Sequence, residues 1–383
     1  MTERPTRLCY VLPEFSDDIC SHLYHTWELL EDLTHRVKIY LFVERATETP
    51  SLKFAEHVYV QRFTRFPFRL LERFFIFSLV RLRGYRNFYV HISHFSSLLA
   101  AAVARLSGGR VYYWNCGLRS VSANERRSFR SRMRQKFLND CAFRSNLKMI
   151  NYLVTGTPLM AEHYSQNYGI SVNKIRVIPN SINLARFQPG NYDCTKIREE
   201  FGVTEGNKVV LFVHWLSERK GAHYLTEIIG KVSDKNPRAT FIIIGDGPYR
   251  DRLAQGINNA GLAKYAQLTG GVPNTEVSRY YAIADLFIMP STDEGFPRVL
   301  LEAMAMGVPF VANDIGGVRD IITARQLAFI SPVGDIASFS DNIIRLLNDD
   351  KVRGELKAEG FAKVKEFEKQ AVADLFANMI AAK

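Results

Sequence analysis

Short apolar runs alternate with stretches of helical character along the whole chain. In the second half, runs such as Val209–Val213, Thr240–Ile244 and Leu286–Met289 are apolar on both faces, and each is followed by a stretch with helical periodicity. The first half repeats the pattern, beginning with Leu8–Leu12 and Val37–Phe42. Strands that are buried on both faces and separated by helices form parallel sheets covered on both sides. The alternation therefore predicts an α/β fold with two doubly wound, Rossmann-like domains.

A domain boundary is expected near Arg186–Asn207, where Pro and Gly gather and apolar periodicity fades. We expect a first domain over 1–190, a second over 191–360 and a C-terminal helical segment over 361–383. Ligands of open α/β sheets lie beyond the carboxyl ends of the strands, so two such domains face to face would hold a ligand in a central cleft. Further strands are expected at Phe88–His91, Val111–Trp114, Ala266–Leu268, Phe310–Ala312 and Ala328–Ile330, and helices at Ser21–Leu33, Ser96–Arg105, Lys220–Ser233, Tyr249–Asn259, Thr275–Ala284 and Pro297–Met306.

Positive charge is concentrated in the first half of the chain. Residues 1–180 hold 26 Lys and Arg against 14 Asp and Glu, and residues 51–150 alone hold 19 against 4. The second half is close to neutral, with 24 basic and 25 acidic residues. A split of this kind indicates two modules with different partners, one of them anionic.

Cysteine spacing and hydropathy favour a cytoplasmic protein. The five cysteines are widely spaced and form no CxxC pair, which is typical of reduced thiols rather than of a disulfide framework or a zinc site. The first 15 residues lack the apolar stretch of a signal peptide. The longest apolar run, Phe74–Val80, is far shorter than the roughly 20 residues of a membrane span. We therefore expect no membrane-spanning segment.

Two series of arginines recur at helical spacing in the basic half. They are Arg62, Arg65, Arg69 and Arg73, with aromatic residues between or after them, and Arg126, Arg130 and Arg134. A helix with a cationic stripe beside an apolar face is typical of a membrane interface, so we expect peripheral binding to an anionic membrane surface. Two ordinary surface helices with solvated arginines are the alternative. Nucleic acid is not expected as a partner, because no recognised binding module is present.

A glutamate lies within an apolar helical pattern. Glu302 stands in the run Val299–Ala305, and a carboxylate in such a setting costs several kcal/mol unless it is paired. Pro297 is expected at the first helical position, which leaves the N–H groups of Arg298 and Val299 as an anion site. Glu302 would lie roughly 6 Å further along the same face.

That separation matches the one between the diphosphate and the ribose hydroxyls of a sugar nucleotide. Glu302 would then accept ribose hydroxyls, and Glu294 would meet the sugar beyond the phosphate. In the alternative, Glu302 is an edge residue whose carboxylate reaches solvent or a neighbouring arginine. A hydrolytic acid/base pair is disfavoured, because it needs two carboxyl groups flanking one bond.

Several ordered motifs resemble those of the retaining glycosyltransferases of family four, the "group 1" transferases, which have the GT-B fold. The stretch EGFPRVLLEAMA, Glu294 to Ala305, resembles the E-x7-E signature of that family. The other matching stretches are VIPNSINLARF (177–187), SERKG (217–221), IGDGP (244–248), GGVP (270–273), ADLFIMPS (284–291) and DIGG (314–317).

The resemblance implies transfer of a sugar from a nucleotide sugar, UDP being the commonest nucleotide of the family. With the basic first domain in mind, we expect the acceptor to be a hydroxyl of a lipid-linked or envelope glycan at the cytoplasmic membrane face. The family fold also implies that the C-terminal helix, Phe361–Ala382, returns to the first domain. No metal and no other cofactor is expected.

The resemblance also implies residue roles. Lys220 would contact the diphosphate, Glu302 the ribose, and Glu294 the sugar hydroxyls, so that Glu294 and Lys220 are the catalytic candidates. The remaining donor-side candidates are Arg219, Gly245, Gly247, Val272, Gly295, Phe296, Pro297, Arg298 and Val299. Weaker candidates on the acceptor or sugar side are His91, His94, Asn115 and Cys116.

The chain departs from the family pattern at two places. His214-Trp215 stands where the family commonly has Gly-Arg, so Arg219 is a candidate for the missing charge. Cys116 stands where the family often has a histidine, and His91 or His94 could substitute for it unless both are ordinary strand-end residues. Trp215 is expected to pack rather than to stack on a ligand. These departures motivate the alternative of a catalytically weak binding protein, beside that of a transferase with a soluble small-molecule or protein acceptor.

Overall fold

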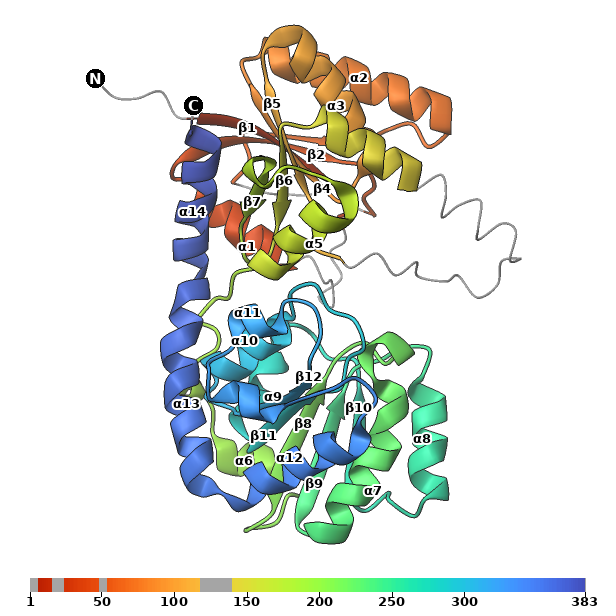
Figure 1. Ribbon diagram of the computed structural model, residues 1–383, viewed down its shortest axis with the longest axis vertical. Coiled ribbons are helices and arrows are strands. Elements are labelled where there is room, and N and C mark those ends of the chain that lie inside the picture. The colour runs from red at the N-terminus through yellow and green to blue at the C-terminus, as the bar shows by residue number, and fades with distance from the viewer. Residues whose placement is uncertain (1–5, 16–23, 48–53, 118–139, 383) are drawn as a thin grey trace. The chain divides into compact units, whose positions relative to one another are not determined.

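The computed structural model describes residues 6–15, 24–47, 54–117 and 140–382 (Figure 1). The chain divides into two compact units. Unit 1 comprises Met1–Pro179 together with Gln370–Lys383, and unit 2 comprises Asn180–Lys369. The division thus falls after Pro179 and not after residue 190. The segment after Pro179 packs within unit 2, where Phe187 is buried and its ring contacts that of Tyr281 at 6.4 Å.

Unit 1 is built on a parallel sheet of seven strands in the order β3-β2-β1-β4-β5-β6-β7. Each described strand pair of this sheet is parallel. The strands are β1 (Thr6–Leu12), β2 (Val37–Val43), β3 (His57–Val60), β4 (Asn87–His91), β5 (Arg110–Trp114), β6 (Tyr152–Thr155) and β7 (Ile175–Val177). The expected parallel sheet is confirmed. Strands β3, β6 and β7 were not predicted.

Alternate residues of these strands enter two separate cores. Cys9 and Val11 belong to a core with α2 (Phe66–Leu82), α3 (His94–Ser107) and α5 (Pro158–Tyr168). Leu8 and Tyr10 belong to the opposite core, with α1 (Tyr24–Leu33) and α14 (Lys369–Ala381). Helices therefore cover both faces of the sheet, as the doubly apolar strands predict.

The C-terminal segment is not a single helix. Helix α13 (Asp350–Val364) is followed by a short 3₁₀ turn, η6 (Lys365–Phe367), and the chain is extended at Glu368 before α14 begins. The backbone of Ile182 bonds with that of Phe367 at 2.8 Å and that of Lys369 at 2.9 Å. This pairing needs an extended segment, which explains why the predicted helix over Phe361–Ala382 is interrupted.

Unit 2 contains a parallel sheet of six strands in the order β10-β9-β8-β11-β12-β13. The strands are β8 (Lys208–Val213), β9 (Ala239–Ile244), β10 (Ala266–Gly270), β11 (Leu286–Met289), β12 (Phe310–Asn313) and β13 (Ile330–Ser331). The last strand is shifted from its predicted place, because Gln326–Phe329 forms a 3₁₀ turn, η5. There the Gln326 side chain donates to the Phe310 carbonyl at 2.6 Å.

Helices cover both faces of this sheet as well. One core joins the strands to α7 (Leu225–Lys235), α8 (Arg250–Asn259) and α12 (Ile336–Asn348). On the other face, α9 (Val277–Ala282) places Tyr281 against Phe287 of β11 at 5.4 Å between ring centroids. The helix predicted from Lys220 begins instead with two 3₁₀ turns, η3 (Glu218–Lys220) and η4 (Ala222–Tyr224), before α7.

Helix α2 buries charged side chains and exposes aromatic ones. Arg73 is 1% exposed and donates to the Glu44 carboxylate at 2.8 Å and to the Gln61 amide oxygen at 2.8 Å. Glu72 is buried too, and accepts from the Tyr59 hydroxyl at 2.7 Å. The expectation that Arg73 faces a membrane is therefore wrong. Its guanidinium is used to neutralise Glu44 inside unit 1.

This buried pair predicts a large effect on stability. Arg73→Met leaves the Glu44 carboxylate buried without its cation, and such a loss costs about 3–5 kcal/mol. Arg65→Met is the matched control, because Arg65 is exposed and surface changes usually stay within about 0.5 kcal/mol. Urea unfolding of both variants measures the difference. A similar small effect in both would mean that the pair does not hold α2.

Candidate functional site

Three side chains converge on one carboxylate oxygen at the carboxyl ends of β8 and β11. Lys220 Nζ lies 2.5 Å from Glu294 Oε1, and His214 Nε2 lies 2.9 Å from the same atom. The Ser291 hydroxyl donates to it at 3.1 Å. Within the described part of the chain, no residue donates to Oε2. Glu294 is thus fixed through one oxygen, and the other is open to a ligand hydroxyl.

The hydrogen bonds also define the state of His214. The Trp215 backbone N–H donates to His214 Nδ1 at 3.1 Å, so Nδ1 is an acceptor and Nε2 carries the proton that Glu294 accepts. Burial, with the Lys220 ammonium beside it, lowers the pKa of His214 below its ordinary value. Neutral imidazole is therefore the form that this site favours.

Charge complementarity keeps Glu294 ionised although it is buried. Burial alone would raise the pKa of Glu294, but the hydrogen bond from His214 and the charge of Lys220 outweigh it and hold that pKa well below its usual range. Burial lowers the pKa of Lys220, and the Glu294 carboxylate opposes that change. The cluster is a desolvated ion pair with a neutral hydrogen-bond donor on its side.

Two glycines lock the backbone around these side chains. A Cβ on Gly245 would lie 1.8 Å from the His214 carbonyl oxygen, and one on Gly316 would lie 1.6 Å from the Glu294 carbonyl oxygen. Both glycines have positive φ, 141° and 45°, so a side chain would be both strained and obstructed. The loops after β9 and β12 therefore pack directly against the backbone of His214 and Glu294.

A second carboxylate lies on α10 (Arg298–Ala305). Glu302 accepts from the buried Tyr281 hydroxyl at 3.3 Å and lies 3.9 Å from the Arg298 guanidinium. Burial lowers the pKa of Arg186 to about 10, and the Glu302 carboxylate opposes that change. A neighbouring arginine thus compensates Glu302, as the edge-residue alternative expected, and the ribose role is not tested by this contact.

The start of α10 differs from its prediction. Pro297 is the N-cap residue, with φ −78° and ψ 96°, and the helix begins at Arg298. Pro297 is therefore outside the helix, because its extended ψ turns the chain before the first helical residue. Next to it, Phe296 is buried and packs edge-on against Phe367 at 5.8 Å.

The other donor-side candidates either make contacts of their own or lie in loops. Arg219 is largely exposed and lies near Asp293, with 3.4 Å to its carbonyl oxygen and 4.0 Å to its carboxylate. Val299 uses its carbonyl to accept from Tyr281 at 3.2 Å. Three further candidates, Gly247, Val272 and Gly295, are loop residues.

Two of the four candidates of unit 1 lie at a tyrosine hydroxyl near the end of β5. His94 Nδ1 lies 2.6 Å from the Tyr113 hydroxyl, and Asn115 donates to that hydroxyl at 3.4 Å. His91 is buried with its ring 4.2 Å from that of Trp114. Cys116 packs against the core of α2, α3 and α5. His94 and Asn115 are thus brought together, whereas His91 and Cys116 take packing positions.

The arginine series divides in the structure. Arg62 and Arg65 are exposed, Arg69 is half-buried, and Arg73 is buried as described above. The second series, Arg126, Arg130 and Arg134, lies outside the described residues. The cationic stripe of the sequence is therefore not a single face of α2.

Four residues of the site were not predicted: His214, Ser291, Tyr281 and Arg186. Ser291 is three residues from its partner Glu294, whereas the partners of the other three are distant in sequence, as in the His214–Glu294 pair, which spans 80 residues. One usable signal was available, because His214 directly follows a buried strand. Trp215 is 58% exposed, so the expectation that it packs is wrong. The loop that carries it turns its indole away from the core.

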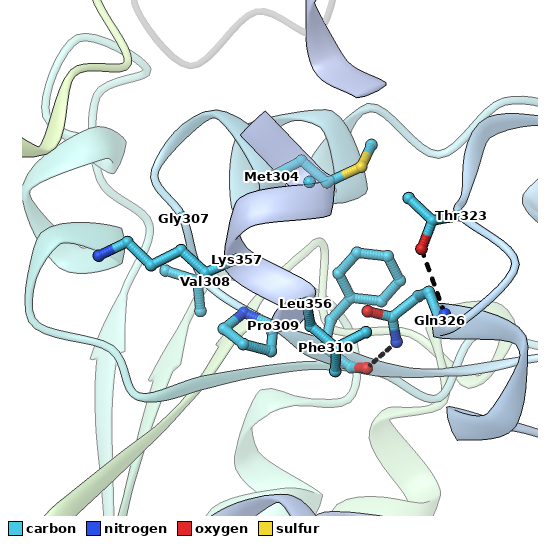
Figure 2. A pocket seen from close by; sticks show the side chains of 10 residues that line it. Met304, Gly307, Val308, Pro309, Phe310, Thr323, Gln326, Leu356 and Lys357 are labelled. Atoms are coloured by element: carbon cyan, nitrogen blue, oxygen red, sulfur yellow. Dashed lines mark hydrogen bonds between the residues drawn. The ribbon is translucent and has the colours of Figure 1, made fainter. Parts of the chain in front are cut away.

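Figure 2 shows a small hollow elsewhere in unit 2, between α10, α13 and β12. Its volume of about 10 Å³ suits no more than a water-sized molecule. The hydrogen bonds visible there join Gln326 to the Thr323 hydroxyl and to the Phe310 carbonyl, and they hold this part of unit 2 together. Among the described residues, no group of three or more His, Cys, Asp or Glu could hold a metal ion. Nor does any helix in these ranges have the length and apolar character to cross a bilayer.

The state of His214 predicts how stability changes with pH. Its pKa is lower in the folded than in the unfolded protein, so the unfolded state binds more protons below about pH 6.5, the ordinary histidine value. Stability should then fall as the pH drops from 6.5 towards the folded pKa. His214→Gln should lose less in melting temperature between pH 7.5 and 5.5 than wild type, whereas the exposed-site variant His35→Gln should match wild type. Equal losses in all three would contradict the assigned neutral state.

Sequence models of known families match the two parts of the chain in succession. "Glycosyltransferase Family 4" matches residues 21–186, and "Glycosyl transferases group 1" matches residues 193–363. Among curated relatives, a 2-deoxystreptamine N-acetyl-D-glucosaminyltransferase of Niallia circulans is 32% identical over 164 residues, 43% of this chain and 41% of that protein. A GDP-mannose-dependent phosphatidylinositol monomannoside mannosyltransferase of Mycobacterium tuberculosis is 28% identical over 182 residues, 46% of this chain and 47% of that protein.

The chain spans between 37% and 52% of the length of the first curated relatives it matches. Anabaena Alr3699/HepE in complex with UDP superposes with a TM-score of 0.76 at 17% identity, over 98% of this chain and 100% of that one. At that identity the likeness shows the fold alone, which is the GT-B fold of two parallel-sheet domains. Because the two models match in order and the fold agrees, the chain belongs to the group 1, family 4 glycosyltransferases.

Proposed function

We propose that the protein is a retaining glycosyltransferase. It moves a sugar from a nucleotide sugar, taken to be a UDP-sugar, to a hydroxyl of a lipid-linked or envelope glycan at the cytoplasmic membrane face. The observation that carries the proposal is the Glu294 carboxylate, fixed at Oε1 by Lys220, His214 and Ser291 with Oε2 open. It lies at the strand edge where open α/β sheets bind ligands.

The cluster suits stabilisation of a departing diphosphate. The Lys220 ammonium has three donors, and one of them is used by Glu294. The remaining N–H groups, with the first amides of α10, would meet the phosphate oxygens as negative charge develops on them. The bond from the sugar anomeric carbon to the diphosphate breaks, and the acceptor oxygen bonds to that carbon from the same face. The acceptor proton leaves with the diphosphate.

The two carboxylates would then serve different parts of the donor. Glu294 Oε2 would accept a sugar hydroxyl, and Glu302 would accept ribose hydroxyls. No metal is required in this scheme, because Lys220 and the helix amides supply the positive charge. Transfer should therefore persist in a chelating agent such as EDTA.

Some known relatives support this donor class and a lipid acceptor, whereas the Niallia circulans relative is named for a small-molecule acceptor, 2-deoxystreptamine. Solved structures of Anabaena Alr3699/HepE contain UDP, or UDP with glucose, or UDP-glucose. The mycobacterial relative is named for a phosphatidylinositol monomannoside acceptor, and its donor is GDP-mannose. UDP-sugars are thus the first donors to test, and GDP-sugars the second.

One observation favours a second candidate, a binding protein with weak catalysis. Trp215 stands in place of a diphosphate-binding arginine, and the exposed Arg219 is engaged with Asp293. A screen of UDP- and GDP-sugars against membrane-lipid extract, read by mass spectrometry, separates the two. A glycosylated product supports the transferase. Donor binding without product or nucleotide release would favour the binding protein.

The two glutamates predict separable defects. Glu302→Gln keeps the side-chain shape but loses a charged acceptor worth about 1.5–3 kcal/mol, so UDP affinity should fall roughly ten- to hundredfold. Glu294→Ala should lower turnover with a smaller change in UDP affinity, because it faces the sugar. Calorimetric titration with UDP and steady-state kinetics measure both.

Glu227→Gln is the matched control, since Glu227 lies on α7 with its side chain 60% exposed. It should leave both quantities unchanged. If Glu302→Gln binds UDP as wild type does, Glu302 serves only Arg298 and Tyr281, and the ribose assignment fails.

A further inference from the structure

Helix α2 presents an unusual face to its surroundings. Phe68, Leu71, Phe75 and Leu82 are 51%, 66%, 62% and 83% exposed. Their spacing of three, four and seven residues places them on one side of a helix. Phe74, 43% exposed, lies beside this row. We call these five residues the apolar face of α2.

The polar side chains Ser78 and Glu72 of α2 form hydrogen bonds within the protein. Ser78 falls on the same helical side, but its hydroxyl donates to the Phe74 carbonyl at 2.8 Å. The helix has one acidic residue, Glu72, which is buried and accepts from the backbone N–H groups of Arg62 at 2.8 Å and Phe63 at 3.0 Å. The helix thus buries Glu72 and Arg73 together with Phe77 and Val80, and leaves its other phenylalanine rings outside. Exposed apolar patches of this kind mark interaction sites.

Further exposed rings extend the apolar face at its N-terminal end. Phe63 contacts Phe68 at 6.0 Å between ring centroids, and Phe66 contacts Phe95 of α3 at 5.6 Å. All four rings are between 47% and 55% exposed. Two pairs of exposed rings therefore lie at the N-terminal end of α2, and one of them is shared with the start of α3.

Arginines flank the apolar face at both ends. Arg62 and Arg65 precede the helix, Arg83 and Arg86 follow it, and all four are exposed. At 1.5 Å per residue, the row from Phe68 to Leu82 is about 21 Å long. A helix with apolar residues along its length and cations at both ends matches an anionic bilayer surface, with its rings below the headgroups and its guanidinium groups at the phosphates.

We propose that α2 docks the protein on an anionic lipid bilayer by embedding its apolar face in the boundary between headgroups and acyl chains. The proposal rests on the membrane-face acceptor of the proposed function, and it assigns the contact to aromatic side chains rather than to an arginine stripe. Charge complementarity identifies lipid as the occupant. The exposed arginines that precede and follow α2 are cationic, and along the helix the face offers no free polar group to set the register of a protein partner.

The test compares three full-length proteins in vesicle co-sedimentation. They are wild type, Leu71→Ser/Phe75→Ser, and the matched control Leu106→Ser/Val172→Ser, whose two residues are 83% and 67% exposed elsewhere in unit 1. Vesicles contain phosphatidylglycerol and phosphatidylcholine, or phosphatidylcholine alone, at 50 mM and 500 mM NaCl. Far-ultraviolet circular dichroism and UDP affinity verify that each protein is folded.

Wild type and control should bind the anionic vesicles, less strongly at high salt but still measurably, since salt screens the arginines and not the apolar contact. The double variant should lose roughly tenfold or more in partition coefficient at both salts, because two large apolar side chains no longer enter the bilayer. Equal binding by wild type and the double variant would overturn the proposal. So would absence of wild-type binding at low salt, or complete loss of it at 500 mM NaCl.

Two further readouts keep the outcomes distinct. Self-association of wild type that disappears in the double variant, without vesicle binding, would assign the face to a second copy and overturn the proposal. Transfer to detergent-solubilised acceptor reports on the proposed function by itself, and the double variant should retain it. Vesicle binding without any transfer would therefore refute the transferase and leave the docking surface standing.

Discussion

A buried carboxylate is the constraint on which the site of unit 2 depends. Glu294 cannot remain ionised in that position without donors, and its donors come from different parts of the chain: the residue after β8, the 3₁₀ turn η3 and the residue that follows β11 by two positions. Satisfying one charge thus fixes two loops at one strand edge, the one between β8 and α7 and the one between β11 and α10. At Gly245 and Gly316 the backbone lies directly against the carbonyl oxygens of His214 and Glu294. Such close packing is needed because the loops must come near enough to exclude water from the buried charge.

The same physical requirement organises unit 1 around Glu44. Its carboxylate accepts from Arg73 of α2 at 2.8 Å and from Ser96 of α3 at 2.5 Å. One charge at the end of β2 therefore ties down two helices. Because Arg73 has to point inward to reach it, the opposite side of α2 is forced outward, and that side carries phenylalanine and leucine. The exposed apolar surface is thus a consequence of where the buried charge lies.

The sequence predicts the sheet of unit 2 well because its signal is local. Leu286–Met289 is found with the expected bounds. Four residues that are apolar on both faces and flanked by turn residues seldom form anything other than a buried strand. The weak points are non-local. Arginine spacing in α2 shows a helix but not which side meets the core, because that depends on Glu44, 29 residues away. Similarly, two of the three partners of Glu294 lie 74 and 80 residues from it, and no periodicity reports such distances. The interruption at Glu368 depends on Ile182 for the same reason.

The place of α14 in the sequence has a consequence for biosynthesis. Val372, Phe376 and Ile380 fill the core on one face of the unit 1 sheet, where the Phe376 ring contacts those of Tyr10 and Tyr89. These residues are translated after all of unit 2. While the ribosome is still elongating, all residues of unit 2 have been translated. One face of the unit 1 sheet still lacks helix α14 at that stage. The half of the protein that is made first therefore receives its last core helix only after all of unit 2 has been translated, and until then that face of its sheet lacks the side chains of α14.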